Sequence, residues 1–462
     1  MPSSVRPAPW NVPHVAGTLP GPRSAAFLAR QEAHESRARS YPRRLPIALA
    51  EGRGSFVRDV DGNVFIDFLG GAGVLSLGHN HPELVAAAVA QFGELAHALD
   101  LPTPAKDAFT RAQLDMLPAS MRDRTKIHFC GPTGANAVEA ALKLCKTATG
   151  RSDIVAFQGA FHGSSHAAMA VTGLVSQKQP MPGGLPGVHF FPYSSCAHCP
   201  VGLLPESCAT NCVTYLERSL TDPNGGIPKP AAVLLELVQG EGGVVPARPD
   251  FVRRVRALTR ELDVPLVVDE VQTGCGRTGT WFCFEQYGIE PDVVIASKAL
   301  SGVGLPVAAI LYDERLDVWA PGAHTGTFRG NQLAFAAGVE AIRIIRRDDV
   351  LGNVRAQGDR IAKHLAALTA LPWVREVRGR GLMWGIELAD LEGQSAGALA
   401  AGVQSKALHE GLIVELGGRD DRVVRMLPPL NVTSRVVDTA CAILTRAVEA
   451  CPARPAASAP LS

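Results

Sequence analysis

Two charged residues stand at the ends of apolar runs that are typical of buried strands. Asp269 follows VPLVV, and Lys298 follows DVVIAS. A carboxylate in such a place is costly unless it meets a cation or several hydrogen-bond donors. The structural alternative for Asp269 is a helix cap or an ion pair with an arginine such as Arg277. The alternative for Lys298 is a side chain that extends its ammonium group to water. If Lys298 instead loses its charge through desolvation, its neutral amine becomes a nucleophile.

A turn rich in small residues, at 131–135 in the segment GPTGANAVEAALKL, leads from a predicted strand into a predicted helix. Small residues leave backbone N–H groups accessible at the start of a helix, and this arrangement suits a phosphate group. The turn matches neither GxxxxGKS/T nor GxGxxG, which disfavours a nucleotide site, and an ordinary turn is the alternative. Together, a phosphate-binding turn, a buried acid and a desolvated lysine describe a pyridoxal phosphate site. There the lysine bonds to the cofactor's aldehyde, and the acid keeps its pyridine nitrogen protonated.

The elements that must position these residues alternate between strand-like and helix-like segments over residues 127–312. The strand-like runs are KIHFC, DIVAF, AAVLLELV, VPLVVDE, DVVIAS and PVAAILY. Between several of them lie helix-like segments such as NAVEAALKLCKTA, with apolar residues at three- and four-residue steps. This alternation predicts an α/β fold with a mostly parallel sheet covered by helices on both faces. In such sheets, ligand-binding residues gather at the carboxyl ends of the strands.

We expect a large domain and a smaller α+β domain, the latter built from N- and C-terminal segments. Residues 56–68 predict a hairpin with its turn at Asp61-Gly62. The expected divisions are a flexible arm at 1–24, an N-terminal part of the small domain at 25–70, the large cofactor-binding domain at 71–335, the C-terminal part of the small domain at 336–452 and a disordered tail at 453–462.

The overall charge of the chain excludes several kinds of partner. Its 462 residues carry a formal net charge of +1. This balance gives no electrostatic footprint for nucleic acid or for an anionic membrane surface. No apolar run reaches the length of about 18 residues that a membrane span needs, and the N-terminus lacks the apolar core of a secretion signal. We therefore expect a cytoplasmic protein without a nucleic-acid or membrane partner.

Four of the ten cysteines gather in one segment, SSCAHCPVGLLPESCATNCVTY. Cys196, Cys199, Cys208 and Cys212 have the ligand number for tetrahedral zinc, and CxxC is a usual half-site for that metal. An iron–sulfur cluster is a further candidate. We favour unligated thiols or occasional disulfides, and assign no metal site.

Three segments occur in a fixed order along the chain: LELVQGEGG, VVDEVQTGCGRTG and SKALSGVGLP. As an ordered set they resemble the class III aminotransferases of fold type I, and the resemblance extends over residues 35–429. Within this family the chain most resembles the 2,4-diaminobutyrate:2-oxoglutarate aminotransferases, through ESRARSYPR, GAGVLSLGHNHP, HFCGPTGANAVEAALKL and PGAHTGTFRGNQLA. The resemblance implies pyridoxal 5'-phosphate as the cofactor and a homodimer with shared active sites.

The resemblance also implies roles for residues around the cofactor. Lys298 is expected to bond to the cofactor and then to move a proton between substrate and cofactor carbons, while Asp269 pairs with the pyridinium nitrogen and Gln272 approaches the phenolic oxygen. The other expected cofactor contacts are the backbone donors of Gly134 and Ala135 to the phosphate, the ring of Phe161 and the adjacent His162. The alternative for Phe161 is an ordinary core aromatic.

Three further residues are matched to contacts with the substrate and the second subunit. Arg425 is expected to hold the α-carboxylate of 2-oxoglutarate or glutamate, and Glu241 to pair with that arginine when the substrate presents no carboxylate there. Thr327 is expected to reach the phosphate of the neighbouring subunit. The alternatives are a surface arginine for Arg425 and a capping glutamate for Glu241.

The reaction that the resemblance implies is a reversible ping-pong transamination. L-2,4-Diaminobutyrate and 2-oxoglutarate give aspartate 4-semialdehyde and glutamate. The alternatives are another ω-aminotransferase, acting on 4-aminobutyrate or ornithine, an aminomutase or decarboxylase on the same scaffold, and a catalytically silent cofactor-binding protein. The presence of Lys298, Asp269 and Gln272 disfavours the silent protein. Arg425 and Glu241 disfavour the mutase, because a mutase needs no external amino acceptor.

Overall fold

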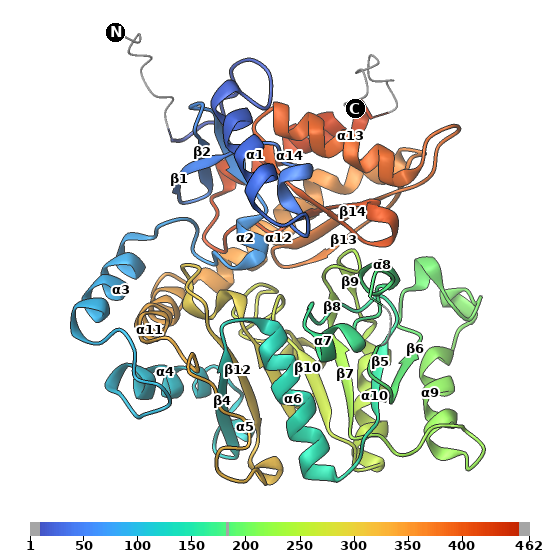
Figure 1. Ribbon diagram of the computed structural model, residues 1–462. Coiled ribbons are helices and arrows are strands. Elements are labelled where there is room, and N and C mark those ends of the chain that lie inside the picture. The colour runs from blue at the N-terminus through green and yellow to red at the C-terminus, as the bar shows by residue number, and fades with distance from the viewer. Residues whose placement is uncertain (1–9, 182–183, 452–462) are drawn as a thin grey trace.

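The structure, a computed structural model, describes residues 10–181 and 184–451. Figure 1 shows two parts, one above the other. The middle of the sequence forms the lower part, and segments from both ends of the chain form the upper part. The boundaries of the two domains stay a prediction. Residues 1–9 of the expected arm and the expected tail at 453–462 lie outside the described residues, while His14 bridges to Val64 and helix α1 (Pro22–His34) begins within the arm.

A seven-stranded sheet with the order β4-β12-β11-β10-β7-β5-β6 forms the centre of the lower part. Its strands are β4 (Thr125–Gly131), β5 (Ile154–Phe157), β6 (Val188–Phe191), β7 (Ala232–Glu236), β10 (Leu266–Asp269), β11 (Val293–Ala296) and β12 (Ala308–Asp313). Only β12 runs against its neighbours β4 and β11, while the other pairs are parallel. The predicted α/β fold with a mostly parallel sheet is therefore confirmed; β6 was not among the predicted strands.

Helices bury both faces of this sheet. Val267 of β10 belongs to the same core cluster as Val138 of α6 (Gly134–Thr149), which lies in front of the sheet in Figure 1. The next residue, Val268, belongs to the core cluster that contains Phe251 of α10 (Pro249–Glu261). Because successive side chains of a strand point to opposite faces, α6 and α10 lie on opposite sides of the sheet.

A helical layer supports the turn that carries Lys298. Helix α11 (Gln332–Arg347) packs on this turn, the 3-10 helix Lys298–Ser301, and on α3 (Pro82–Glu94) and α4 (Pro104–Leu114). A Cβ atom at Gly338 of α11 would lie 2.6 Å from the carbonyl oxygen of Leu300. The absence of a side chain there lets α11 approach the turn closely and fix its backbone.

Two smaller sheets join the ends of the chain in the upper part. One has the order β1-β2-β3-β15 and the other the order β13-β14-β17-β16. Their strands are β1 (Leu49–Arg53), β2 (Phe56–Asp59), β3 (Val64–Asp67), β15 (Leu412–Ile413), β13 (Val374–Arg380), β14 (Met383–Leu388), β17 (Val423–Met426) and β16 (Glu415–Gly417), beside helices α12 (Val350–Leu365), α13 (Ala396–His409) and α14 (Ser434–Glu449). The predicted hairpin is confirmed, since β2 and β3 pair antiparallel around Asp61-Gly62.

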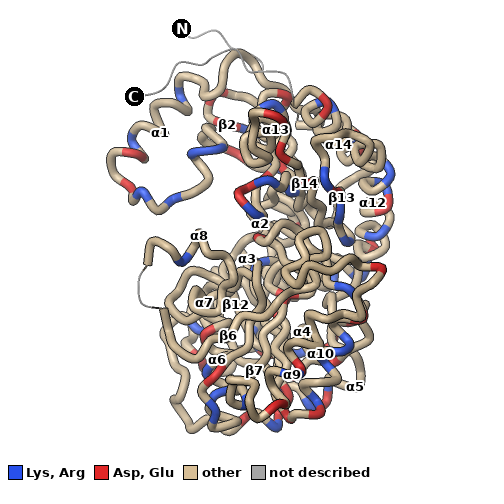
Figure 2. The backbone as a smooth tube through the Cα atoms, turned by 90° about the vertical axis from the view of Figure 1, so that its right-hand side faces the viewer, with Lys and Arg blue, Asp and Glu red and all other residues tan. Residues whose placement is uncertain are grey.

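The remaining α-helices and strands lie in the connections between these elements. They are α2 (Gly70–Gly73), α5 (Ala119–Arg122), α7 (His166–Ala170), α8 (Val175–Lys178), α9 (Asn211–Thr221), β8 (Val238–Gln239) and β9 (Val245–Pro246). Figure 2 shows acidic and basic residues interspersed over both parts. Over the residues that the structure describes, no helix combines the length and the apolar character needed to cross a membrane.

Candidate active site

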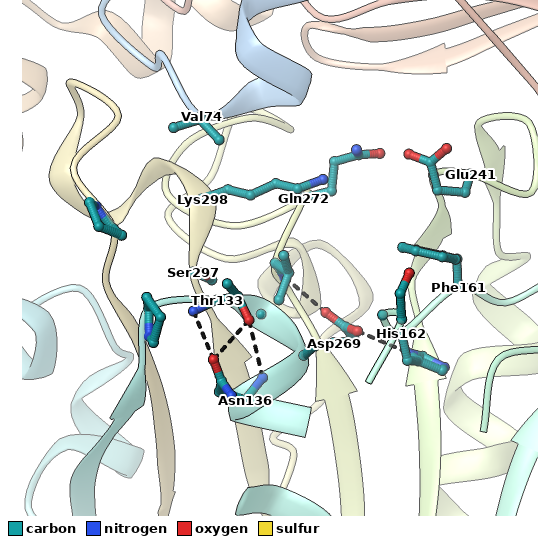
Figure 3. Close-up of a pocket in the computed structure, with 18 of the residues that line it drawn as sticks. Val74, Thr133, Asn136, Phe161, His162, Glu241, Asp269, Gln272, Ser297 and Lys298 are labelled. Carbon is teal, nitrogen blue, oxygen red and sulfur yellow. Dashed lines mark hydrogen bonds and ion pairs between the residues drawn. The ribbon is translucent and has the colours of Figure 1, made fainter. Parts of the chain in front are cut away.

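The carboxyl ends of the central strands open into a cavity of about 620 Å³. Most of the residues predicted for the site line it: Gly134, Ala135, Phe161, His162, Glu241, Asp269, Gln272 and Lys298. In Figure 3 the Lys298 side chain extends towards Gln272, and Asp269 lies below them beside His162. Residues that are far apart in the sequence thus meet at the sheet edge where the strand pattern predicts a ligand site.

Asp269 is the last residue of β10, and only 6% of its surface is exposed. Its Oδ2 lies 2.8 Å from His162 Nδ1, and its Oδ1 accepts a hydrogen bond of 3.0 Å from the Val271 amide. Arg277, the alternative ion-pair partner, instead donates to the carbonyl oxygens of Leu382 and Pro428. The carboxylate is therefore held in a fixed orientation without being neutralised by an arginine.

A second buried acid, Glu236, lies directly beside Asp269 because the two residues are paired across β7 and β10. Its carboxylate accepts hydrogen bonds from the amides of Phe161, at 2.8 Å, and Gly240, at 3.0 Å. These contacts fix the two loops that enter the cavity from β5 and β7. Burial raises the pKa of Glu236 to about 7.

This pKa predicts that Glu236 makes stability depend on pH. Folding raises the pKa of this carboxyl group from 4.5 to about 7. Between these values the unfolded chain has released a proton that the folded chain still holds, so the folded state is stabilised less as the pH rises. Its contribution therefore falls by about 3 kcal/mol as the pH rises through this range. We expect the Tm of the Glu236→Gln apo-protein, relative to that of the wild type, to rise steadily between pH 5 and pH 8, because only the wild type loses this contribution. Glu206→Gln, at an exposed position, should leave the difference flat.

Lys298 follows β11 directly after Ser297 and has a φ of +37°, a region that costs an L-residue on the order of 1–2 kcal/mol. Burial lowers the pKa of its amine, against the opposing effect of the Glu241 carboxylate, and Arg425 lowers it further. The Ser297 hydroxyl donates a hydrogen bond of 3.0 Å to the Val307 carbonyl, which anchors the strained turn. The surroundings thus favour the neutral, nucleophilic amine.

The turn before α6 is organised by Thr133 and Asn136, as predicted for a strand-to-helix turn. Thr133 is the N-cap residue of α6, and Asn136 Oδ1 accepts hydrogen bonds from its amide, at 3.2 Å, and its hydroxyl, at 2.9 Å. The amides of Gly134 and Ala135 begin the helix, where backbone N–H groups have no intrahelical partner. A Cβ atom at Gly134 would lie 3.0 Å from Val271 Cγ1, so a larger residue would crowd this turn.

Arg425 of β17 is linked to the cavity by hydrogen bonds to Glu241, which lines it. Its Nη1 donates a hydrogen bond of 3.0 Å to Glu241 Oε1 and its Nη2 one of 2.7 Å to Oε2. The arginine is only 1% exposed, which rules out a surface role, and Glu241 is engaged in this pair rather than in a helix cap. Burial opposes ionisation of both groups, but their mutual attraction lowers the pKa of Glu241 and raises that of Arg425.

The remaining predictions lie away from this cavity. Thr327 is exposed and does not line it; its carbonyl oxygen lies 3.0 Å from His97 Nε2. The four clustered cysteines line a separate cavity of about 30 Å³ beside Arg248. Within residues 10–181 and 184–451, no group of three or more His, Cys, Asp or Glu side chains is arranged to hold a metal ion.

Comparisons with known proteins connect this arrangement to a family. A model of that family, described as aminotransferase class-III, matches residues 38–448. The chain belongs to the class III aminotransferases. This aminotransferase is 48% identical over 437 residues to the diaminobutyrate–2-oxoglutarate aminotransferase of Rhizobium meliloti, with 92% of this chain and 93% of that relative covered. It is 45% identical over 418 residues to the enzyme of the same name from Haemophilus influenzae, with 88% and 91% covered.

Solved structures agree on the fold. The ornithine aminotransferase of Toxoplasma gondii, in a structure with partial occupancy of PLP at its active site, matches with a TM-score of 0.80 at 27% identity, covering 92% of this chain and 94% of that one. An (S)-enantioselective ω-transaminase from Thermomicrobium roseum matches with a TM-score of 0.83 at 25% identity, covering 93% and 99%. The predicted family and fold type are therefore confirmed, while the roles of individual residues stay predictions.

The site fits pyridoxal phosphate, the cofactor of this family. Gln272 and His162 line the cavity, and each has one buried side-chain atom, Gln272 Oε1 and His162 Nε2, without a hydrogen-bond partner among the described residues. The first turn of α6 offers N–H donors to a phosphate, and the fixed Asp269 carboxylate offers an acceptor to a protonated ring nitrogen. The donor and acceptor chemistry of the cavity therefore matches both polar ends of the cofactor.

Proposed function

We propose that this aminotransferase uses pyridoxal phosphate to transfer the terminal amino group of L-2,4-diaminobutyrate to 2-oxoglutarate, giving aspartate 4-semialdehyde and glutamate. The bidentate pair of Arg425 with Glu241 is the observation that supports this most directly. When Glu241 pairs with the Arg425 guanidinium, the site suits a donor that reacts at its terminal amine. When Glu241 does not pair with it, the guanidinium can bind the α-carboxylate of 2-oxoglutarate or glutamate. The names of the two bacterial relatives support the choice of donor.

Several residues of the cavity can bind and orient the cofactor by their charge and their shape. When bound, pyridoxal phosphate supplies an electron sink that lets a proton leave the substrate carbon. The amides of Gly134 and Ala135 would hold the phosphate, and Asp269 would keep the ring nitrogen protonated. His162 keeps the Asp269 carboxylate in position through the 2.8 Å contact between Nδ1 and Oδ2. Phe161 covers one face of the ring.

Lys298 performs the proton transfers in both half-reactions. Its amine is the nucleophile that would hold the cofactor between turnovers. Once free, this amine would act as the general base that accepts the proton from the substrate carbon and as the general acid that gives it back. Burial lowers the pKa of this amine, which favours its neutral, proton-accepting form. Gln272 orients the phenolic side of the ring.

The donor is tested by half-reactions of the holoenzyme with L-2,4-diaminobutyrate, 4-aminobutyrate and L-ornithine, followed through the cofactor absorbance. We expect kcat/KM for L-2,4-diaminobutyrate to exceed the other two values by at least about tenfold. A preference for 4-aminobutyrate or ornithine would contradict the proposed donor. If no amine reacts, or if the amino group never reaches free 2-oxoglutarate, transamination itself is contradicted.

Replacing Arg425 with lysine should weaken the acceptor half-reaction. Lysine keeps the positive charge but loses the planar fork that a carboxylate requires for two parallel hydrogen bonds. We expect the KM for 2-oxoglutarate to rise by about tenfold or more, since loss of a charged hydrogen bond costs about 1.5–3 kcal/mol. Arg435→Lys, at an exposed position of α14, is the matched control. An unchanged KM would remove Arg425 from the acceptor site.

We further propose that two copies of the chain form a dimer through an apolar patch beside Thr327. Its exposed side chains are Val89 and Phe92 of α3, Leu99 and Leu101 of the following loop, and Phe328, of which 72% is exposed. The ring centroid of His97 lies 5.7 Å from that of Phe328, which joins the two loops of the patch. Exposed apolar side chains gathered near one another support a protein interface, and Thr327 would then face the cofactor of the second subunit.

The dimer is tested by placing a charge in this patch. We expect Phe328→Asp to shift the holoenzyme towards a monomer in light scattering and to reduce transamination by at least about tenfold, because a buried unpaired charge costs several kcal/mol. Leu204→Asp, which changes a side chain 69% exposed on the cysteine-rich loop, should do neither. A fully active Phe328→Asp monomer would contradict shared active sites.

A further inference from the structure

A second cavity of about 300 Å³ adjoins the first, and Glu241 lines both. Its wall is formed by the segment around Tyr41, by β16 and by the loop that follows β16. Glu415, the first residue of β16, faces this cavity. The other acid in the wall, Asp421, already pairs with Arg44 at 2.5 Å. Glu415 is therefore the acidic side chain whose charge is not balanced by a neighbour of its own.

Glu415 shares Arg425 with Glu241, and the sharing is unequal. Glu241 takes both hydrogen bonds of the guanidinium fork. Glu415 Oε2 lies 2.9 Å from Arg425 Nη2 but accepts no hydrogen bond of regular geometry among the described residues. One guanidinium balances one carboxylate, so the ionised group of three side chains carries one excess negative charge. This excess lies in a buried place where an unbalanced charge is costly.

This charge imbalance affects the pKa of Glu415. Burial raises the pKa of Glu415 and Glu241 raises it further, while Arg425 acts in the opposite direction. The backbone holds the carboxylate in place, because Glu415 and Arg425 are paired across β16 and β17. A Cβ atom at Gly417 would lie 2.6 Å from Arg425 Nε, so this glycine leaves room for the arginine beside the strand. Paired strands thus place Glu415 beside Arg425, and together with Glu241 the three side chains lack one positive charge.

We propose that Glu415 binds the ammonium group at the non-reacting end of the amino donor. This inference rests on the proposed function and deepens it, since it assigns the residue that distinguishes diamino acids from simple ω-amino acids. An α-ammonium supplies the missing positive charge and donates a hydrogen bond to the Glu415 carboxylate. Burial lowers the pKa of Lys298, where the terminal amine reacts, and the Glu415 carboxylate acts in the opposite direction, so the two groups lie within electrostatic range. Glu415 is thus a specificity-determining residue.

Two donors of equal chain length test this subsite. L-2,4-Diaminobutyrate and 4-aminobutyrate have the same terminal amine and carboxylate, and they differ only in the α-ammonium. In the holoenzyme, Glu415→Gln keeps the size of the side chain and removes its charge. We expect kcat/KM for L-2,4-diaminobutyrate to fall by at least about tenfold, the effect of losing a charged hydrogen bond. The value for 4-aminobutyrate, and that for glutamate, should stay unchanged or rise.

A binding measurement separates recognition from the chemical step. In the inactive Lys298→Ala protein, Glu415→Gln should raise the Kd for L-2,4-diaminobutyrate by the same factor in calorimetry. Glu415→Asp, which keeps the charge on a shorter side chain, should retain more activity with this donor than Glu415→Gln. Glu376→Gln changes a partly exposed acid of the same sheet and is the matched control.

The possible outcomes distinguish the subsite from the proposed function. Equal losses with both donors, or equal activity of Glu415→Gln and the wild type, would overturn the ammonium subsite and leave transamination intact. If the wild type reacts with neither donor, the proposed function fails and the subsite with it. A loss confined to L-2,4-diaminobutyrate in both rate and Kd supports the subsite.

Discussion

Replacement of Lys298 by alanine is expected to lower the rate of transamination by at least about 10⁴-fold. General acid–base catalysis alone contributes about 10²- to 10⁴-fold, and the variant also loses the nucleophile that holds the cofactor between turnovers. Stopped-flow measurement of each half-reaction, with L-2,4-diaminobutyrate and with glutamate, gives the rate of the proton transfer. Both half-reactions should fall together, because the same amine moves the proton in each.

The controls for Lys298 separate its chemistry from its charge and from general effects. Lys298→Arg keeps a positive charge but provides no neutral amine near neutral pH, so it should be as slow as the alanine variant. Lys229→Ala changes an exposed lysine and should behave as the wild type. A residual rate above roughly 1% in Lys298→Ala would show that another group carries the proton.

Asp269→Asn is expected to reduce kcat by about 10²- to 10³-fold. Asparagine has nearly the same shape but cannot keep the ring nitrogen protonated by charge, and removing one partner of a buried pair costs about 3–5 kcal/mol. The contact of Asp269 Oδ2 with His162 Nδ1 is also weakened, because a neutral amide replaces the carboxylate. The absorbance spectrum of the bound cofactor, recorded against pH, reports the protonation of the ring directly.

Two comparisons make the Asp269 result specific. Asp269→Glu restores the charge on a longer side chain and should recover part of the lost rate. Asp263→Asn changes an acid whose side chain is 75% exposed and should be silent. An Asp269→Asn protein with the activity and spectrum of the wild type would exclude the proposed role of this acid.

The sequence alone predicts the strands and the helix start that carry the site residues. The apolar runs before Asp269 and Lys298 predict β10 and β11, and the structure contains both strands with these residues at or just after their ends. The glycine-rich turn likewise predicts the start of α6. These predictions succeed because continuous apolar runs and small-residue turns are local signals, and strands buried on both faces show them clearly.

The partners of the site residues were less predictable, because they depend on contacts between distant segments. His162 was expected near the cofactor, but its contact with Asp269 joins residues 107 positions apart. Glu415 gave no sequence signal at all, since a single glutamate in a short strand resembles many surface residues. Its meaning comes from the pairing of β16 with β17, which places it beside Arg425. The alternative of Arg277 as the partner of Asp269 was wrong for the same reason.

The pairing of β3 with β15 determines the order in which the protein can be completed during synthesis. Ile66 and Asp67 are aligned with Leu412 and Ile413, so the N-terminal hairpin lacks this neighbour until the ribosome has made most of the chain. The seven strands of the large sheet lie between residues 125 and 313 and can associate earlier. Contacts of such long sequence separation form slowly, and domains fold as units during translation. The N-terminal hairpin therefore remains dependent on β15, a segment that emerges late in synthesis.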